Sequence, residues 1–205
     1  INGAFPRSES GRVYEVLTSK GASIANPSLA SRKDLRDAVV AARAAQSGWA
    51  KATAYNRGQI LYRIAEMLEG RTDQLVTEIS LATGVSTKKA HDEVLAAIDR
   101  WVWYAGWSDK LSAAFGSTNP VSGPYYNFTI PEPQGVIAVA PAESFLAFID
   151  AIAPAIVSGN TVVALVPGSA AIAAMTFAEV LATSDLPAGV INILTGSHDE
   201  LAPWA

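Results

Sequence analysis

Three short apolar runs in the C-terminal part of the chain constrain its fold more than any other feature. They are Val136–Ala140, Thr161–Val166 and Val190–Leu194, and apolar stretches of helical length separate them. Each run is apolar at consecutive positions rather than at alternate ones, which is typical of a strand buried on both faces. Strands that alternate with helices form right-handed βαβ units in a parallel sheet. The pattern therefore predicts half of a doubly wound, nucleotide-binding type of domain.

The segment from Glu132 to Gly196 contains Glu132, Pro133 and Gly135, then Gly159–Val163, and finally Thr195 and Gly196. This framework resembles that of the aldehyde dehydrogenase family. Members of that family carry a stretch of the form EPxGVVxxxxPWNFP, followed by APALAxGNTVVxKPxE and LPxGVxNxVTG. The chain keeps most of this framework in the same order, and weaker matches nearer its start extend the resemblance over essentially the whole chain. The matching residues are Glu132, Pro133, Gly135, Val136, Pro141, Ala153–Ala155, Gly159–Val163, Leu186, Pro187, Gly189, Val190, Asn192, Thr195 and Gly196.

The resemblance implies an α/β fold in three parts. Residues 1–124 are expected to form the helical N-terminal part of the aldehyde dehydrogenase fold, and residues 125–131 a strand of a small antiparallel oligomerisation element. Residues 132–205 are expected to form the first βαβαβ half of a Rossmann-type coenzyme domain, which is incomplete. Because a three-stranded parallel sheet has long edges that need cover, we expect a longer polypeptide or another chain to complete this domain.

Helical periodicity between residues 31 and 114 predicts four helices. Ser31 and Asp34 have the spacing of a capping box at the start of the first one. Gly70 and Gly84 are expected to end the second and third helices. The four helices are predicted to begin near Ser31, Arg57, Thr72 (as a cap) and Thr87, and the last one to run to Ala114.

Aldehyde oxidation in this family uses a Cys thiolate as nucleophile, a Glu base, an Asn amide in the oxyanion hole, and NAD(P) as hydride acceptor. The chain contains no Cys, and the resemblance places the family's Cys and Glu beyond Ala205. It places the Asn in the loop after the first apolar run, where this chain has Ala142 and Glu143. An oxyanion needs hydrogen-bond donors, and losing one costs roughly 10²–10³ in rate, whereas a carboxylate brings a negative charge. We therefore predict no catalytic residue in this chain.

The residues that hold the cofactor in this family are also replaced. The resemblance places the family's Lys and Glu, which bind the adenosine ribose, at Val166 and Ser169. After the third apolar run the family often has a Gly-x-Gly-x-x-x-Gly stretch, where the chain approaches the cofactor closely. Here only its first glycine, Gly196, remains, and a Cβ at the other two positions blocks close approach of the backbone. If a pocket survives, Pro141, Pro167 and Gly196 are the residues expected to contact NAD(P). These departures predict that the chain binds no cofactor.

An aromatic cluster on the fourth predicted helix indicates a surface for a partner. Trp101 continues the buried stripe, whereas Trp103 and Trp107 share another face at the spacing i, i+4. Tryptophans are enriched among the residues that anchor interfaces. Residues 116–124 have the composition of a hinge, and the alternation in Tyr125–Ile130 predicts a half-exposed strand. We expect this strand and the two tryptophans to contact another aldehyde dehydrogenase module or subunit.

Two functions are compatible with these observations. In the first, the chain is a non-catalytic module used for assembly or scaffolding with a catalytic aldehyde dehydrogenase module. Such a chain resembles the catalytically empty second module of the double-length (tandem) aldehyde dehydrogenases. In the second, it is the N-terminal half of an active NAD(P)-dependent aldehyde dehydrogenase that oxidises aldehydes to carboxylic acids. The missing cofactor and oxyanion residues favour the first.

The composition argues against several other classes of protein. With 15 basic and 19 acidic residues the formal charge is −4, which disfavours a nucleic-acid surface. No run reaches the ~18 consecutive apolar residues of a membrane span, and Ile1 begins no basic signal-peptide region. The two histidines, His91 and His198, lack the spacing of a metal site. Because a chain without Cys fits a reducing compartment, we expect a cytoplasmic protein.

Overall fold

The computed structural model describes residues 1–204, and its centre is a parallel sheet of three strands. The strands are β5 (Val136–Val139), β6 (Thr161–Val166) and β7 (Ile191–Thr195), in the spatial order β5-β6-β7. Helices α6 (Phe145–Val157) and α7 (Ala170–Ala182) make the two crossover connections. The three apolar runs thus form the predicted strands, and the predicted α/β class with a parallel sheet is confirmed.

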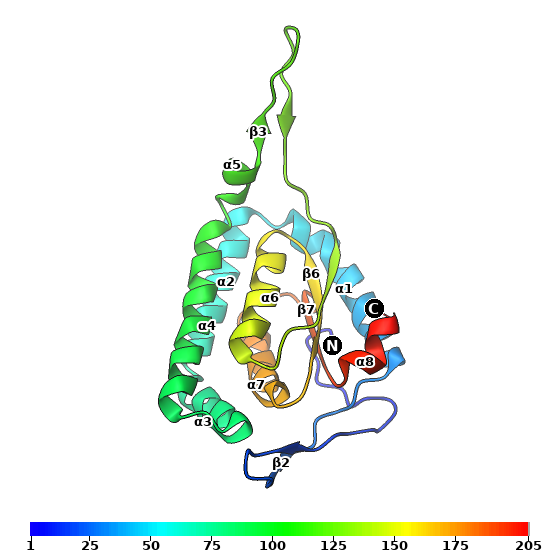
Figure 1. The fold of residues 1–205 in the computed structure, drawn as a ribbon. Helices are drawn as coiled ribbons and strands as arrows, with labels where there is room; N and C mark the ends of the chain where they lie inside the picture. The colour runs from blue at the N-terminus through cyan, green and yellow to red at the C-terminus, as the bar shows by residue number, and fades with distance from the viewer. Residues whose placement is uncertain (205) are drawn as a thin grey trace.

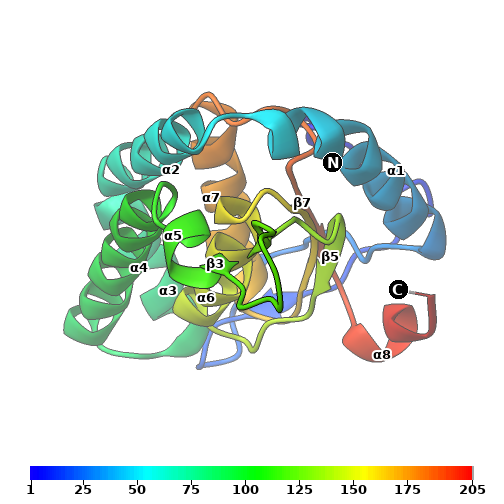
Figure 2. The same cartoon turned by 90° about the horizontal axis from the view of Figure 1, so that it is seen from above.

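The sheet lies between two layers of helices (Figures 1 and 2). Helix α1 (Arg32–Lys51) covers one face, where Val163 of β6 belongs to a small core with residues of α1. Helices α6 and α7 cover the other face, where Val162 and Val166 belong to the larger core. Because both faces of β6 are covered, the strand is almost entirely buried. Three further helices pack on the side of the larger core: α2 (Ala54–Glu69), α3 (Thr72–Thr83) and α4 (Thr87–Trp107).

Helix α1 is anchored at both ends. Its predicted capping box is present, since Ser31 Oγ accepts from the Asp34 N–H at 3.3 Å and the Asp34 carboxylate accepts from the Ser31 N–H at 2.8 Å. Near its C-terminal end, Trp49 Nε1 donates to the Ile156 carbonyl at 2.8 Å. The local sequence therefore sets where α1 begins, and a long-range contact sets how it lies against α6.

The starts of α2 and α3 differ from the predicted ones. Helix α2 begins before Arg57, because Thr53 caps it with its side chain. Thr72 is not the cap of α3 but its first residue; Arg71 holds the cap position. The Thr72 hydroxyl donates to the preceding Glu69 carbonyl at 2.8 Å. Its side chain therefore bonds the end of α2 instead of capping α3.

The predicted fourth helix is wrong at its C-terminal end. Instead of running to Ala114, α4 ends at Trp107 and a separate short helix, α5 (Leu111–Phe115), follows. At Ser108 the backbone N–H and the hydroxyl both donate to the Ala105 carbonyl, at 3.3 and 2.9 Å. A serine hydroxyl that bonds a nearby carbonyl in this way competes with the regular helical pattern. Apolar periodicity does not reveal that competition.

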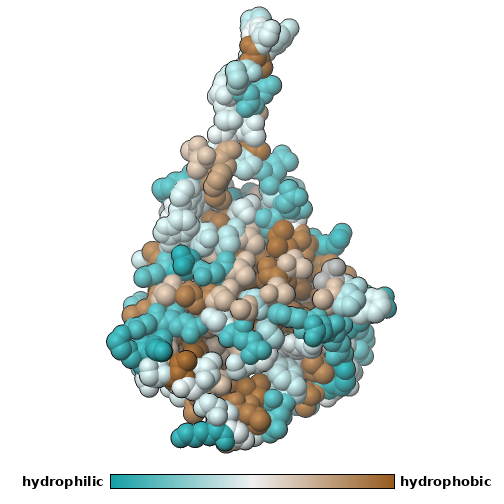
Figure 3. Space-filling model, viewed as in Figure 1, coloured by the Kyte–Doolittle hydropathy of each residue, from teal (hydrophilic) through white to brown (hydrophobic). Residues whose placement is uncertain are grey.

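Residues 116–130 form a two-stranded hairpin that projects from the body of the molecule (Figures 1 and 3). In it, β3 (Ser117–Thr118) pairs antiparallel with β4 (Phe128–Thr129). The predicted hinge therefore supplies a strand, and only part of the predicted strand Tyr125–Ile130 is paired. The segment is exposed rather than half-exposed: Tyr126 is 78% and Phe128 52% accessible, because no other element of residues 1–204 covers it.

The remaining elements lie at the two ends of the chain. Near the start, β1 (Val16–Leu17) pairs antiparallel with β2 (Ser23–Ala25). After β7, a short helix α8 (His198–Leu201) leads into a 3₁₀ turn at Ala202–Trp204. Within residues 1–204, each helix is too short or too polar to cross a membrane.

Candidate functional site

A cleft opens at the carboxyl ends of the three parallel strands, where ligands bind in open α/β sheets. Its volume is about 790 Å³. The loops after β5, β6 and β7 form most of its walls, and residues from the N-terminal segment complete it. The lining residues are Tyr14, Leu29, Ala140–Glu143, Pro167, Gly168 and Gly196–Asp199.

The three residues predicted to contact a cofactor meet in this strand-end cleft. Pro141 follows β5, Pro167 follows β6, and Gly196 follows β7, and all three line the cleft. Gly196 has φ +152°, and a Cβ there would lie 3.3 Å from the Ala30 nitrogen. The fold therefore brings the predicted residues together and still uses the retained glycine for a close backbone approach. Whether a cofactor binds them stays a prediction.

Glu143 brings a negative charge to the cleft. Gly168, at φ +52°, lies against this side chain so closely that a Cβ on Gly168 would be 2.5 Å from the carboxylate. The Tyr14 hydroxyl lies 3.5 Å from the Gly168 carbonyl oxygen. Burial, together with the negative charge of Glu143, raises the pKa of Tyr14 to about 12. Asp199 adds a second carboxylate, and the described lining contains no Lys or Arg.

The loop that carries Glu143 is held from a distant helix. Ser144 caps α6 by accepting from the Ala147 N–H at 3.2 Å, and its hydroxyl donates to the Glu93 carboxylate at 2.9 Å. The same oxygen of Glu93 accepts from the Leu146 N–H at 3.0 Å. Sequence reasoning missed Glu93, because this residue of α4 is remote in sequence from the loop that it fixes.

The position of Val166 corrects one expectation about the cleft. Its side chain is completely buried in the larger core, so it does not face a ligand at the end of β6. Successive side chains of a strand point to opposite faces, and Leu165 lies on the other face, packed against the small core. In the family stretch GNTVVxKP, one residue separates the two valines from the lysine. An alignment without a gap therefore places the lysine at Leu165 rather than at Val166. Neither side chain forms hydrogen bonds, so the loss of the lysine stands.

His198 lines the cleft, beyond the end of β7. Its Nε2 donates to the Leu165 carbonyl at 2.9 Å, so this nitrogen carries the proton. The contact places the imidazole across the end of β6. In the part of the chain that the structure describes, no group of three His, Cys, Asp or Glu side chains is arranged to hold a metal ion.

The aromatic residues of α4 divide between two faces, as predicted. Trp101 is completely buried and stacks on Phe177 with ring centroids 5.7 Å apart. Trp103 is 51% exposed and packs against Trp107 at 5.3 Å. Trp107 in turn lies 6.4 Å from Phe115 of α5. These three exposed-face aromatics line a cavity of about 470 Å³ at the base of the hairpin.

Comparison with known proteins identifies the family. The model of the aldehyde dehydrogenase family matches residues 5–203, so the chain belongs to that family. Cytosolic 10-formyltetrahydrofolate dehydrogenase of Xenopus tropicalis is 35% identical over 207 residues, covering 96% of this chain and 23% of that protein. Human retinal dehydrogenase 2 is 36% identical over 203 residues, covering 96% of this chain and 39% of that protein.

Solved structures agree with this assignment. A putative aldehyde dehydrogenase from Burkholderia cenocepacia superposes with a TM-score of 0.93 at 29% identity, covering 100% of this chain and 42% of that one. The NAD+ complex of an aldehyde dehydrogenase from Bacillus cereus superposes with a TM-score of 0.93 at 27% identity and the same coverage. The chain thus spans less than half the length of these relatives.

Proposed function

We propose that this chain is a non-catalytic aldehyde dehydrogenase module that assembles with a catalytic aldehyde dehydrogenase module. The observation that carries the proposal is the Glu143 carboxylate packed against Gly168 in a cleft whose described lining has no cation. By this reading the chain corresponds in role to the catalytically empty second module of the tandem aldehyde dehydrogenases.

The charges of the cleft do not fit a dinucleotide. The pyrophosphate of NAD(P) is anionic and is favoured by backbone N–H groups, helix N-termini or basic side chains. Here Glu143 and Asp199 contribute negative charge, and the Glu143 carboxylate lies so close that a Cβ on Gly168 would be 2.5 Å from it. The same carboxylate accepts hydrogen bonds when ionised, whereas an oxyanion requires donors. Both the binding step and the chemical step are therefore disfavoured.

The exposed aromatic surfaces support a role in assembly. The hairpin side chains Tyr125, Tyr126 and Phe128 are 75%, 78% and 52% exposed. Trp103 and Trp107 continue the apolar surface at the base of the hairpin. Isolated two-stranded hairpins are marginally stable in water, so a partner module that covers these faces would stabilise the segment.

Calorimetric titration with NAD and NADP tests the loss of cofactor binding. The wild-type chain should give no binding heat up to millimolar ligand, and the aldehyde dehydrogenase from Bacillus cereus serves as the positive control for NAD. The Glu143→Gln variant removes one charge and keeps the size of the side chain. We expect it to remain silent too, because no cation is gained. A micromolar dissociation constant for the wild-type chain would overturn the proposal.

The second candidate is the N-terminal half of an active NAD(P)-dependent aldehyde dehydrogenase. The family match over residues 5–203, and the 36% identity to a protein named retinal dehydrogenase 2, favour it. A polypeptide that carries this chain, purified from its source, is then expected to reduce NAD or NADP in the presence of an aldehyde. Aldehyde-dependent turnover that is lost on Glu143→Gln would assign the cleft to catalysis and reject the non-catalytic module.

A further inference from the structure

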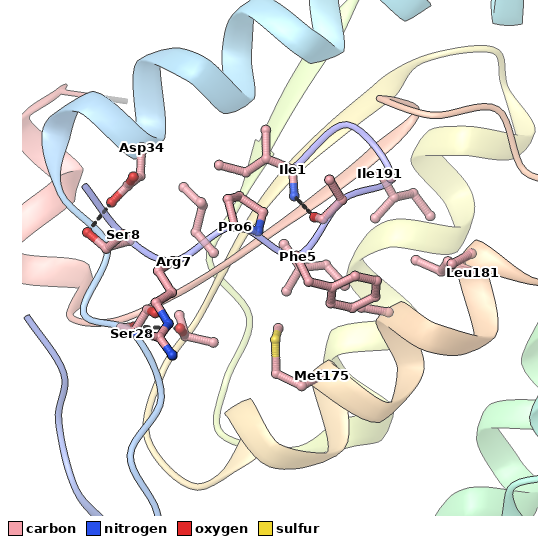
Figure 4. Close-up of a pocket in the computed structure, with 18 of the residues that line it drawn as sticks. Ile1, Phe5, Pro6, Arg7, Ser8, Ser28, Asp34, Met175, Leu181 and Ile191 are labelled. Atoms are coloured by element: carbon pink, nitrogen blue, oxygen red, sulfur yellow. Dashed lines mark hydrogen bonds between the residues drawn. The ribbon is translucent and has the colours of Figure 1, made fainter. Parts of the chain in front are cut away.

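A second cavity, here called the edge groove, follows the outer side of β7 and shares no lining residue with the strand-end cleft (Figure 4). Its volume is about 370 Å³. The N-terminal segment forms one wall and α7 the other, with β7 between them. The apolar residues that line it include Phe5, Met175, Leu181, Leu186, Ile191 and Ile193.

The backbone of β7 supplies polar groups to the edge groove. β7 is an edge strand, because among the described residues its only sheet neighbour is β6. The Val190 carbonyl and the Gly196 N–H bond to β6, so by alternation the peptide groups of Ile191 and Ile193 point outwards. Those outward groups have no backbone or side-chain partner within residues 1–204. Open edge groups of this kind are a ready site for hydrogen bonding.

Arg7 brings a positive charge to the groove. Arg7 lines the groove and has no carboxylate within ion-pair distance among the described residues. Figure 4 shows it at the Ser28 end, while the Phe5 ring points towards Leu181. The carboxylate among the lining residues, Asp34, already accepts from the Ser8 hydroxyl at 2.6 Å. The groove therefore has a cationic end and an apolar remainder.

We propose that the edge groove binds a small amphipathic carboxylate with a single aliphatic chain. The tail lies between the side chains of Phe5 and Met175, so that the open peptide groups of β7 stay in contact with water, and the carboxylate meets Arg7 at the Ser28 end. An apolar cavity with a few convergent polar groups is the usual form of a small-molecule site. The site is independent of the strand-end cleft, and so it stands whether or not a dinucleotide binds there.

The methionine methyl groups allow a direct test, because the chain has only 2 Met. Met175 lines the groove, whereas Met67 packs against the larger core and serves as an internal reference. On titration of the 13C-methyl-labelled chain with octanoate, the Met175 signal should shift in a saturable manner and the Met67 signal should stay. A titration with 1-octanol separates the contribution of the tail from that of the charge.

Substitutions separate the two halves of the proposed site. Arg7→Gln should weaken octanoate about tenfold while octanol is unchanged, because a charge-assisted hydrogen bond is lost. Arg43→Gln is the matched control, since Arg43 is an exposed arginine of α1 outside the groove, and it should leave octanoate binding as in the wild type. Ala178→Leu, which fills the groove, should abolish the Met175 shift with both ligands.

Three results would overturn the proposal. The first is a Met175 signal that octanoate does not move. The second is an equal loss of octanoate affinity in Arg7→Gln and Arg43→Gln, which would indicate a non-specific charge effect. The third is unchanged binding in Ala178→Leu. Because Arg7 is exposed and makes no described ion pair, Arg7→Gln should fold, and circular dichroism checks this.

Discussion

The central strand β6 and the hairpin built from β3 and β4 contain similar kinds of residues in opposite environments. Val162 and Val166 of β6 are completely buried, whereas Phe128 and Ile130 of the hairpin are 52% and 58% exposed. β-Branched and aromatic residues favour strands in both segments. The two segments differ in what packs on them, because helices lie on both faces of β6 and no element of residues 1–204 lies on the hairpin (Figures 1 and 2).

This comparison distinguishes residues that stabilise the folded body from exposed residues that are available to a partner. Changes in β6 lower the free energy of unfolding, because its side chains are buried on both faces of the sheet. We expect changes in the hairpin to leave the body largely intact and to weaken the proposed association, because large exposed apolar patches are rare on soluble monomers. Four sets of variants test this difference between the two regions.

Val166→Lys tests the buried strand, β6. An ammonium placed in the larger core loses its hydration, and we expect the free energy of unfolding to fall by on the order of 4 kcal/mol. Leu165→Lys is the matched control on the opposite, partly buried face of the same strand, and should lose less than half as much. Urea unfolding followed by circular dichroism measures both. Equal losses would contradict the alternation described for β6.

The Val166→Lys and Leu165→Lys chains also test whether one lysine restores cofactor binding in the cleft. Neither is expected to bind NAD in a calorimetric titration, because Glu143 still lies against Gly168. Tight binding in the Leu165→Lys chain would show that one lysine is enough to restore the pocket.

Trp103→Ala combined with Trp107→Ala tests the base of the hairpin. Interface anchors contribute about 2 kcal/mol or more each, so association with a catalytic module should weaken strongly. Trp101→Ala is the comparison, since Trp101 packs on Phe177 in the core, and it should instead lower the free energy of unfolding by about 3–5 kcal/mol. Light scattering and co-purification measure association. A double variant that assembles normally but unfolds easily would assign both tryptophans to the core.

Phe128→Asp tests the hairpin itself. We expect association to weaken about tenfold, or about 1.4 kcal/mol, while the free energy of unfolding changes by less than about 0.5 kcal/mol. Leu17→Asp in β1 is a matched control, because Leu17 is an exposed apolar residue (43%) of the other small sheet. If both variants associate equally well with the partner module, the hairpin is not the contact.

Asp34→Ala tests the start of α1 and its dependence on pH. Burial acts to raise the pKa of Asp34, but hydrogen bonds from Ser8 and Ser31 outweigh it and the pKa is lowered. A lowered folded-state pKa stabilises the fold above the ordinary carboxyl pKa of about 4, and this contribution disappears as the pH falls through the folded value. We therefore expect a loss of about 1 kcal/mol at pH 7.

The pH series for the Asp34→Ala chain should converge with the wild type at low pH. Asp37→Ala is the control, because Asp37 is an exposed carboxylate on the same helix, and it should show little change at either pH. A constant difference between Asp34→Ala and the wild type from pH 7 to pH 2 would contradict the role of the ionised carboxylate.

Residues whose environment depends on near neighbours were predictable from the sequence. The consecutive apolar positions of Thr161–Val166 indicated a strand covered on both faces, and β6 is such a strand. The spacing of Ser31 and Asp34 located the start of α1. The i, i+4 spacing of Trp103 and Trp107 placed them on one face of α4. In each case the period of the local structure decides which side chains share a face.

The contacts between segments that are distant in sequence could not be predicted from the sequence and are seen only in the folded chain. The contact of Glu93 with Ser144, the carboxylate of Glu143 against Gly168, and the edge groove beside β7 each join residues that no local period relates. The break of α4 after Trp107 likewise depends on hydrogen bonds at Ser108 that apolar spacing does not report. The physical reason is that periodicity records which side of an element is buried, whereas the partner it is buried against depends on how the whole chain packs.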